Sequence, residues 1–88
     1  MAAKDYSKGS AAGLSARFAG AVTPSDGTDL SYVTRAVFVG TGGNLEVNMA
    51  GNDTTVVLTG VPDGAFLPIS VSRILDGNTT ASNIVAFW

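Results

Sequence analysis

The chain has 88 residues, of which 45% are hydrophobic and 14% are charged, and its net charge is −2. It contains neither cysteine nor histidine, which excludes disulfides and leaves carboxylates as the only strong side-chain ligands for a transition metal. So short a chain buries only about 60–65% of its unfolded surface, and without disulfides we expect partner subunits to add stability.

Residues 1–29 are predicted to form an extended N-terminal arm. Alanine, glycine and serine dominate this segment, and the turn sequence TPSDGTD ends it. Leu14, Phe18 and Val22 are spaced by four residues, which permits one or two turns of helix, although nearby glycines weaken the pattern. We expect residues 1–22 to lie along a neighbouring subunit or another protein, where these apolar side chains are buried.

The arm and the rest of the chain carry opposite charge. Residues 1–17 hold three basic residues and one acidic residue (3 − 1 = +2), whereas residues 18–88 hold two arginines and six acidic residues (2 − 6 = −4). This distribution suits an arm that contacts an acidic protein surface, with simple solubility as the alternative. A nucleic-acid footprint needs a denser basic patch, so no nucleic-acid partner is predicted.

Residues 30–88 are predicted to form an all-β domain, a small antiparallel β-sandwich of jelly-roll type. Short segments rich in β-branched residues alternate with turn sequences. The predicted strands are 33–39, 45–49, 54–59, 66–75 and 84–88. The predicted core contains Val37, Val47, Val57, Leu67, Ile69 and Ile84, together with Phe38 and Phe66. On the second strand, Glu46 and Asn48 are expected to face outward.

The glycine cluster Gly40-Thr41-Gly42-Gly43 follows a strand, as in a phosphate-binding loop, but a helix would have to come next. Instead the alternating sequence NLEVNM follows, which predicts a strand and makes the glycines a hairpin turn. AGNDT and PDG are predicted turns, the latter with Pro62 at its first central position. Because Pro68 donates no ladder hydrogen bond, its strand lies at a sheet edge or begins there.

The sequence predicts no enzyme. Nucleophilic catalysis lacks a histidine base, and GLSAR is no G-x-S-x-G elbow. Asp26 and Asp29 in SDGTD do not match a calcium-binding loop and are better explained by Asx-turns. No cofactor and no metal site is predicted.

Three residues of the body are candidates for contacts between proteins. Arg35 and Arg73 each lie in a predicted strand. Each either faces solvent with its stem over apolar neighbours or pairs with an aspartate of another subunit. Trp88 at the C-terminus suits an interface or a final strand packed on the sheet.

No apolar segment approaches the roughly 20 residues of a membrane-spanning helix, and the N-terminus MAAKDYSKGSAAG lacks the apolar region of a signal peptide. We therefore expect synthesis in a cytoplasm and no membrane partner.

Three sequence blocks carry a family resemblance. They are TPSDGTDLSYVTRAVFVGTGGNLEV, VVLTGVPDGAFLPISVSRIL and GNTTASNIVAFW, and together they span residues 23–88. In this order and spacing they resemble small virion proteins, namely the head-spike base or capsid decoration proteins of tailed phages and gene transfer agents. Where family members often carry a further basic residue near Arg73, this chain has Ser70 and Ser72.

The resemblance implies a β-sandwich subunit on the head surface of a virion, made in the host cytoplasm. Its implied partners are the major capsid protein, further copies of itself (five favoured, three an alternative) and a spike or fibre protein. The residues predicted to contact the capsid or a neighbouring subunit are Leu14, Arg17, Phe18, Val22, Arg35, Arg73 and Trp88.

Two other functions compete with head decoration. Small sandwiches also serve as receptor-binding or glycan-binding modules, but the loops GTGGN, AGND, PDG and DGNTTASN contain no aromatic residue for stacking on a sugar. A tail or baseplate component is the third hypothesis.

Overall fold

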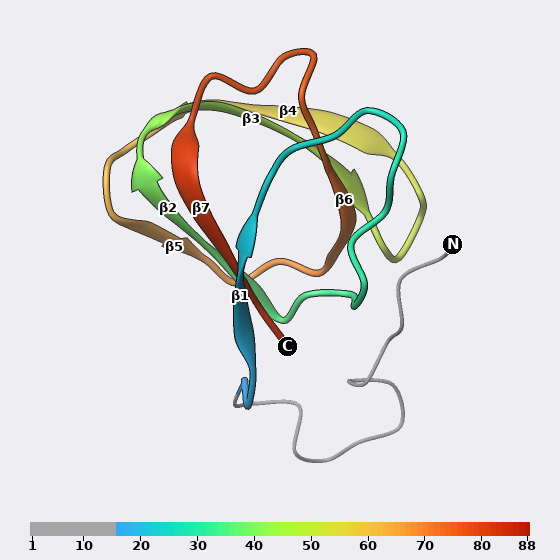
Figure 1. Ribbon diagram of the computed structural model, residues 1–88. Coiled ribbons are helices and arrows are strands. Elements are labelled where there is room, and N and C mark those ends of the chain that lie inside the picture. The colour runs from blue at the N-terminus through green and yellow to red at the C-terminus, as the bar shows by residue number, and fades with distance from the viewer. Residues whose placement is uncertain (1–15) are drawn as a thin grey trace.

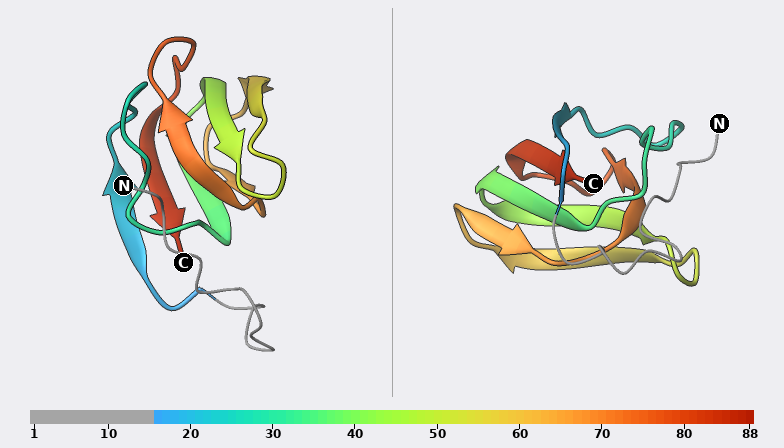
Figure 2. Two further views of the ribbon diagram at one scale, coloured as in Figure 1. Left: turned by 90° about the vertical axis from the view of Figure 1, so that its right-hand side faces the viewer. Right: turned by 90° about the horizontal axis from the view of Figure 1, so that it is seen from below.

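The computed structural model describes residues 16–88, which form seven strands and no helix (Figure 1). The strands are β1 (Ala19–Val22), β2 (Ala36–Thr41), β3 (Gly43–Met49), β4 (Thr55–Val61), β5 (Ala65–Leu67), β6 (Val71–Leu75) and β7 (Ser82–Phe87). They build a four-stranded sheet of order β1-β7-β2-β5 and a three-stranded sheet of order β4-β3-β6. All pairs are antiparallel, and the two sheets face each other (Figure 2). The predicted all-β sandwich is therefore confirmed.

Most strands that follow one another in the chain lie in different sheets. Only β3 and β4 form a hairpin between consecutive strands, through the predicted AGNDT turn. The chain changes sheet between β2 and β3, between β4 and β5, between β5 and β6 and between β6 and β7. Consecutive strands that alternate between two sheets are the arrangement of jelly-roll sandwiches.

The glycine cluster spans the end of β2 and the start of β3 and is one of these crossings, so the predicted hairpin is wrong. A Cβ atom on Gly42 would lie 2.2 Å from the carbonyl oxygen of Val61, and Gly43 has a φ of 151°. The glycines are needed because the chain passes close to the backbone of β4 while it turns into the second sheet. A glycine-rich segment can form either a hairpin turn within one sheet or a crossing between two sheets. Packing of the two sheets decides between them.

The strand predicted over 66–75 is two strands in different sheets. β5 ends at Leu67, just before Pro68, and β6 begins at Val71. β5 lies at the edge of its sheet, in agreement with the edge position expected next to proline. The PDG turn also differs in detail. The Ala65 amide donates to the Pro62 carbonyl at 3.3 Å, which places Pro62 at the first corner of the turn, not at a central position.

The core lies between the sheets and consists of aliphatic side chains. Val37, Val47 and Ile84 are buried as predicted, and Leu67 and Ile69 are half-buried against them. The other core members are Val39, Leu45, Val61, Val71, Ile74 and Ala81.

Two predicted core residues are exposed. Val57 is 40% exposed because it pairs with Glu46 on the outer side of the edge strand β4, and Phe66 is 59% exposed on the edge strand β5. Phe38 pairs with Phe66 on the outer side of the four-stranded sheet and is half-buried. Alternation identified two faces of each strand but assigned these residues to the wrong one.

The segment before β2 is attached to the sandwich. Residues 19–22 form a strand against β7 instead of helical turns. Further on, the amides of Ser25, Leu30 and Thr34 donate to carbonyls of β6 at 2.9, 2.9 and 3.2 Å, so residues 25–34 cover the free edge of β6. Leu14 lies outside the described residues. The division into an arm of residues 1–29 and a sandwich of residues 30–88 stays a prediction, with residues 19–22 integrated in the sheet.

Candidate interaction surfaces

The C-terminal residue Trp88 is the centre of an aromatic cluster. Its ring stacks on Tyr32 at 4.9 Å and on Phe18 at 6.2 Å between ring centroids. The Trp88 amide donates to the Phe18 carbonyl at 2.9 Å, and its own carbonyl accepts the Phe18 and Arg17 amides at 3.0 and 2.7 Å. A Cβ atom on Gly20 would lie 3.1 Å from the indole ring, so glycine makes room for it. The entry to β1 and the end of the chain are thus bound together.

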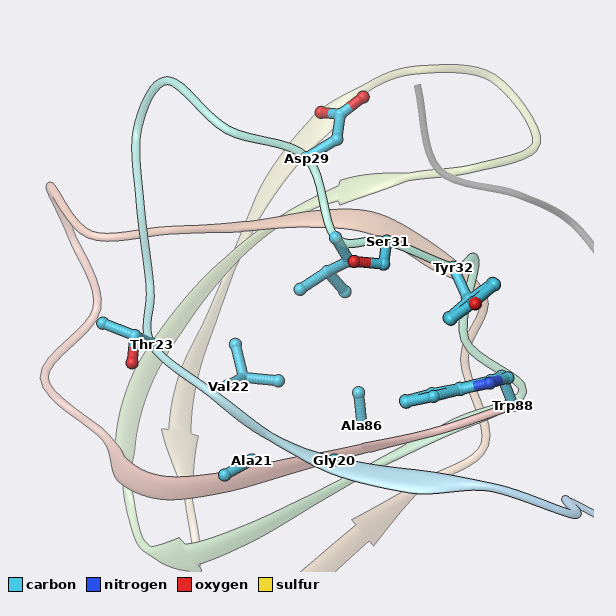
Figure 3. Close-up of a pocket in the computed structure, with 10 residues that line it drawn as sticks. Gly20, Ala21, Val22, Thr23, Asp29, Ser31, Tyr32, Ala86 and Trp88 are labelled. Atoms are coloured by element: carbon cyan, nitrogen blue, oxygen red, sulfur yellow. The ribbon is translucent and has the colours of Figure 1, made fainter. Parts of the chain in front are cut away.

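A small pocket opens beside this cluster (Figure 3). Its volume is about 240 Å³, below the roughly 300–1,000 Å³ of typical small-molecule sites. It is lined by Gly20, Ala21, Val22, Thr23, Asp29, Leu30, Ser31, Tyr32, Ala86 and Trp88. The size fits a single side chain better than a sugar or a nucleotide.

The structure brings several predicted contact residues together at this end of the sandwich. Arg17 is exposed and Phe18 is 57% exposed. Val22 is half-buried and lines the pocket with Trp88. Arg35 is adjacent, since its amide donates to the Phe87 carbonyl at 2.7 Å.

Arg73 is paired within its own chain, with a residue that lines the same pocket. Its Nε donates to Asp29 Oδ1 at 2.8 Å and its Nη1 to the Asp26 carbonyl at 3.0 Å. Asp26 Oδ1 in turn accepts the amides of Asp76 and Gly77, both at 2.9 Å. The carboxylate that binds Arg73 is therefore intramolecular, and the two aspartates fasten distant segments instead of forming local Asx-turns.

Glu46 faces outward from β3, as predicted, but it is only 9% exposed. Its carboxylate accepts the amide and the side-chain Nδ2 of Asn78, both at 3.2 Å, so the loop after β6 folds over it. The outer side of the three-stranded sheet is thus polar and partly covered by a loop.

The outer side of the four-stranded sheet is apolar except for Asn83 near the start of β7. Strand register places one set of side chains on this side, opposite the core-facing set that contains Val37, Val39, Ile84 and Ala86. We call this surface the apolar face; it consists of Ala19, Ala21, Ala36, Phe38, Phe66, Val85 and Phe87. Phe66 and Phe87 contact each other with centroids 5.7 Å apart.

Strand β4 exposes two valines that point to opposite sides of the sheet, Val56 to the core side opposite Val47 and Val57 to the outer side opposite Glu46. Val56 is 37% and Val57 is 40% exposed. Among residues 16–88, β4 pairs only with β3, and the segment Thr55–Val61 contains no charged residue. Long apolar edge strands are templates for pairing with another chain, which proteins usually prevent with charges or proline.

Within residues 16–88 no group of three or more acidic residues is placed to hold a metal ion. The same part of the chain contains no helix that could cross a membrane.

Comparison with known proteins shows a similarity to a solved structure. No protein-family model matches the chain, and no curated protein matches it. A solved structure described as "Capsid of native GTA particle computed with C5 symmetry" contains a chain that is 38% identical over 84% of both chains, with a TM-score of 0.75. The chain belongs to the family of this gene transfer agent capsid protein. Membership supports the predicted structural role in a virion.

The sequence analysis missed some of the residues that form these surfaces. Asp29 was considered for calcium, yet it joins Arg73 to the wall of the pocket. The apolar face was missed altogether. Its signal was present in AVFVG and NIVAF, where apolar residues occupy successive positions without alternation, as in strands covered on both faces.

Proposed function

We propose that this protein decorates the head of a phage or gene transfer agent, as a spike base or cement protein at capsomer vertices. One observation carries the proposal: the 38% identity, over 84% of both chains, to a chain of a gene transfer agent capsid. The role is structural, and the partner that holds the protein on the particle is the major capsid protein.

The anchor to the capsid is the segment that precedes β1. Its first 17 residues carry a charge of +2, whereas residues 18–88 carry −4. Because residues 19–22 belong to the sheet, the anchor is shorter than residues 1–22 and starts from a fixed point beside Trp88. Phe18, 57% exposed at that point, continues the contact surface.

Copies of the protein form a ring, with five copies favoured and three as the alternative. The related capsid was computed with C5 symmetry, the symmetry in which a ring of five at a vertex would be resolved. A weak contact per copy then becomes strong, because a ring binds through several contacts at once. A spike or fibre protein is the further partner of such a ring.

Imaging of particles tests the proposal. Particles that lack this protein are incubated with the full chain or with a chain that begins at residue 16, and the density on the head is compared. We expect the full chain to add density at capsomer vertices and the shortened chain to fold but to bind poorly. The cut at residue 16 preserves every strand, and circular dichroism of both chains checks the fold.

Two results would contradict this assignment. Density on the tail or baseplate instead of the head would favour a tail component. Equal occupancy by both chains would place the anchor in the sandwich, on the surface around Arg17, Phe18 and Trp88.

A further inference from the structure

Four strands lie at the edges of the two sheets, and two of these edges are closed. Residues 25–34 cover the outer edge of β6 through backbone hydrogen bonds. β5 contains only three residues and ends directly before Pro68, and short strands beside a proline resist pairing with another chain. The edges of β1 and β4 remain. Within residues 16–88, β1 pairs only with β7, and β4 pairs only with β3.

The free backbone groups of β1 belong to Ala19 and Ala21. Phe18 and Trp88 exchange two backbone hydrogen bonds, at 3.0 and 2.9 Å. In an antiparallel pair, residues bonded in this way alternate with residues whose amide and carbonyl point away from the partner strand. The alternation therefore turns the backbone groups of Ala19 and Ala21 away from β7, toward the outer edge of the sheet. The side chains of these two alanines belong to the apolar face.

On β4 the free backbone groups belong to Thr55 and Val57. The Met49 amide donates to the Thr54 carbonyl at 2.9 Å, and this pair opens the ladder between β3 and β4. Alternation from this pair turns the amides and carbonyls of Thr55 and Val57 away from β3. Both side chains lie on the outer side of the sheet, with Val57 opposite Glu46. At both open edges, the residues with free backbone groups are thus the residues whose side chains face outward.

The two open edges are therefore complementary. Antiparallel pairing joins residues with free backbone groups on one strand to residues of the same kind on the other, and each such pair exchanges two hydrogen bonds. Thr55 of one copy would pair with Ala21 of another. Val57 would pair with Ala19. Because all four side chains face outward, the core side of one sheet would continue into the core side of the other. Neither strand contains a charged residue, so no like charges would meet.

This register also covers exposed apolar side chains. Phe18, Val56 and Val57 are three of the four large hydrophobic side chains that are exposed in residues 16–88. Val56 points to the core side and would lie opposite Gly20, which lines the pocket at the edge of β1 (Figure 3). The next pair would join Leu58 to Phe18, where the capsid anchor begins. A pocket whose size fits one side chain would thus receive Val56.

We propose that β4 of one copy pairs antiparallel with β1 of the next copy, with Thr55 opposite Ala21 and Val56 at the pocket. The occupant of each edge is a second copy, because the chain itself supplies a strand that matches the edge in free backbone groups, side-chain direction and absence of charge. Each copy uses two different edges, one for each neighbour, as in a closed ring of identical chains. This inference rests on the self-association within the proposed function and names the edges that produce it.

Introduced cysteines test the register, since the chain has no cysteine of its own. Full-length Ala21→Cys/Thr55→Cys places both sulfurs in one bonded pair, whose Cα separation of about 5.5 Å permits a disulfide. Ala21→Cys/Thr59→Cys is the matched control, and all three positions are exposed. After oxidation at high micromolar concentration, we expect the first variant to give a ladder of covalent oligomers that a reductant dissolves. The control should remain mostly single chains, because its cysteines lie four positions out of register.

A second pair of variants tests the backbone pairing. Val57→Pro removes an amide that points away from β3, so the ladder within the monomer keeps its bonds. Val57→Thr keeps this amide and is the matched control. Circular dichroism and thermal unfolding establish that both variants fold, and Ala21→Pro replaces Val57→Pro if that variant does not fold. In sedimentation and native mass spectrometry, we expect Val57→Thr to associate like wild type and Val57→Pro to associate more than about tenfold more weakly.

Three results would overturn the contact. They are a wild-type chain that stays monomeric at high micromolar concentration, cross-linking that is no stronger at position 55 than at position 59, and a folded proline variant that associates like wild type. Head occupancy of wild-type protein on particles is measured separately, so decoration of the head stands or fails on its own result.

Discussion

The two sheets of this protein pack on one core but differ on their outer sides. The three-stranded sheet turns Glu46, Asn48 and Arg73 outward, and loops bind two of these side chains. The four-stranded sheet turns mainly apolar side chains outward, with Asn83 near the start of β7 as a polar exception. Since the core needs only one side of each sheet, the outer sides are free to differ, and the apolar one is available for assembly.

The edges of the sheets show the same division. On one side of the three-stranded sheet, the Arg73–Asp29 ion pair and the backbone bonds of residues 25–34 close the edge of β6. On the other side, no strand of the described part of the chain pairs with the outer edge of β4. Polar contacts therefore complete the fold at one edge, whereas the strand at the opposite edge carries no charged residue.

The largest expected effect separates the inner from the outer side of the three-stranded sheet. Val47→Asp places an unpaired charge in the core, where Val47 is 0% exposed, and should destabilise the fold by several kcal/mol, on the order of 4. Val57→Asp, at a 40% exposed position of the neighbouring strand, should cost only about 1 kcal/mol of monomer stability, because the new carboxylate lies opposite Glu46 on the solvent side. Urea unfolding of both variants measures the contrast. A neutral Val47→Asp would mean that the core side of β3 is misassigned.

The crossing between the sheets is the next target. Gly42→Ala would bring a Cβ atom to 2.2 Å from a backbone oxygen and should cost about 3 kcal/mol, because two backbones must separate. Gly51→Ala is the control in the hairpin turn, since nothing lies within 4 Å of a Cβ atom there. Equal urea midpoints for the two variants would show that the crossing is looser than the structure indicates.

A smaller effect is expected when the buried hydroxyl of Thr34 is removed. This hydroxyl joins the segment before β2 to the connection between β5 and β6. Thr34 Oγ1 donates to the Ile69 carbonyl at 2.8 Å and accepts the Val71 amide at 3.0 Å. Thr34→Val keeps the shape but leaves both groups without their partner, at a cost of about 2 kcal/mol. Thr28→Val, at an exposed position, serves as the reference in thermal unfolding. Identical melting temperatures would argue against this role of Thr34.

The smallest expected effect concerns the ion pair at the closed edge. Arg73→Lys cannot reproduce the contacts of both guanidinium nitrogens with Asp29 and Asp26, and should lose up to about 1 kcal/mol of stability. The loss should shrink at high salt, because screening weakens such partly exposed pairs. Arg17→Lys, at an exposed position before β1, is the matched control. A loss that does not depend on salt would indicate packing instead of charge.

Part of the interaction surface was predictable from the sequence. Phe18, Val22 and Trp88 were selected for apolar character near the termini, and the structure places them around one end of the sandwich. Arg73 was expected to pair with an aspartate, but a sequence cannot say whether the carboxylate belongs to the same chain. Asp29 reaches Arg73 across 44 positions, a proximity that only the folded chain creates.

The sequence by itself determined the strands and much of the core. Alternating and β-branched segments identified them, and Val37, Val47 and Ile84 lie in the core as expected, because side-chain direction along a strand is a local property with a period of two. Only the tertiary structure decided which strands pair, where the chain crosses between sheets at Gly42 and Pro68, and that Val57 and Phe66 face outward. Period two establishes that a strand has two faces, but which face is buried depends on the sheet that packs against it.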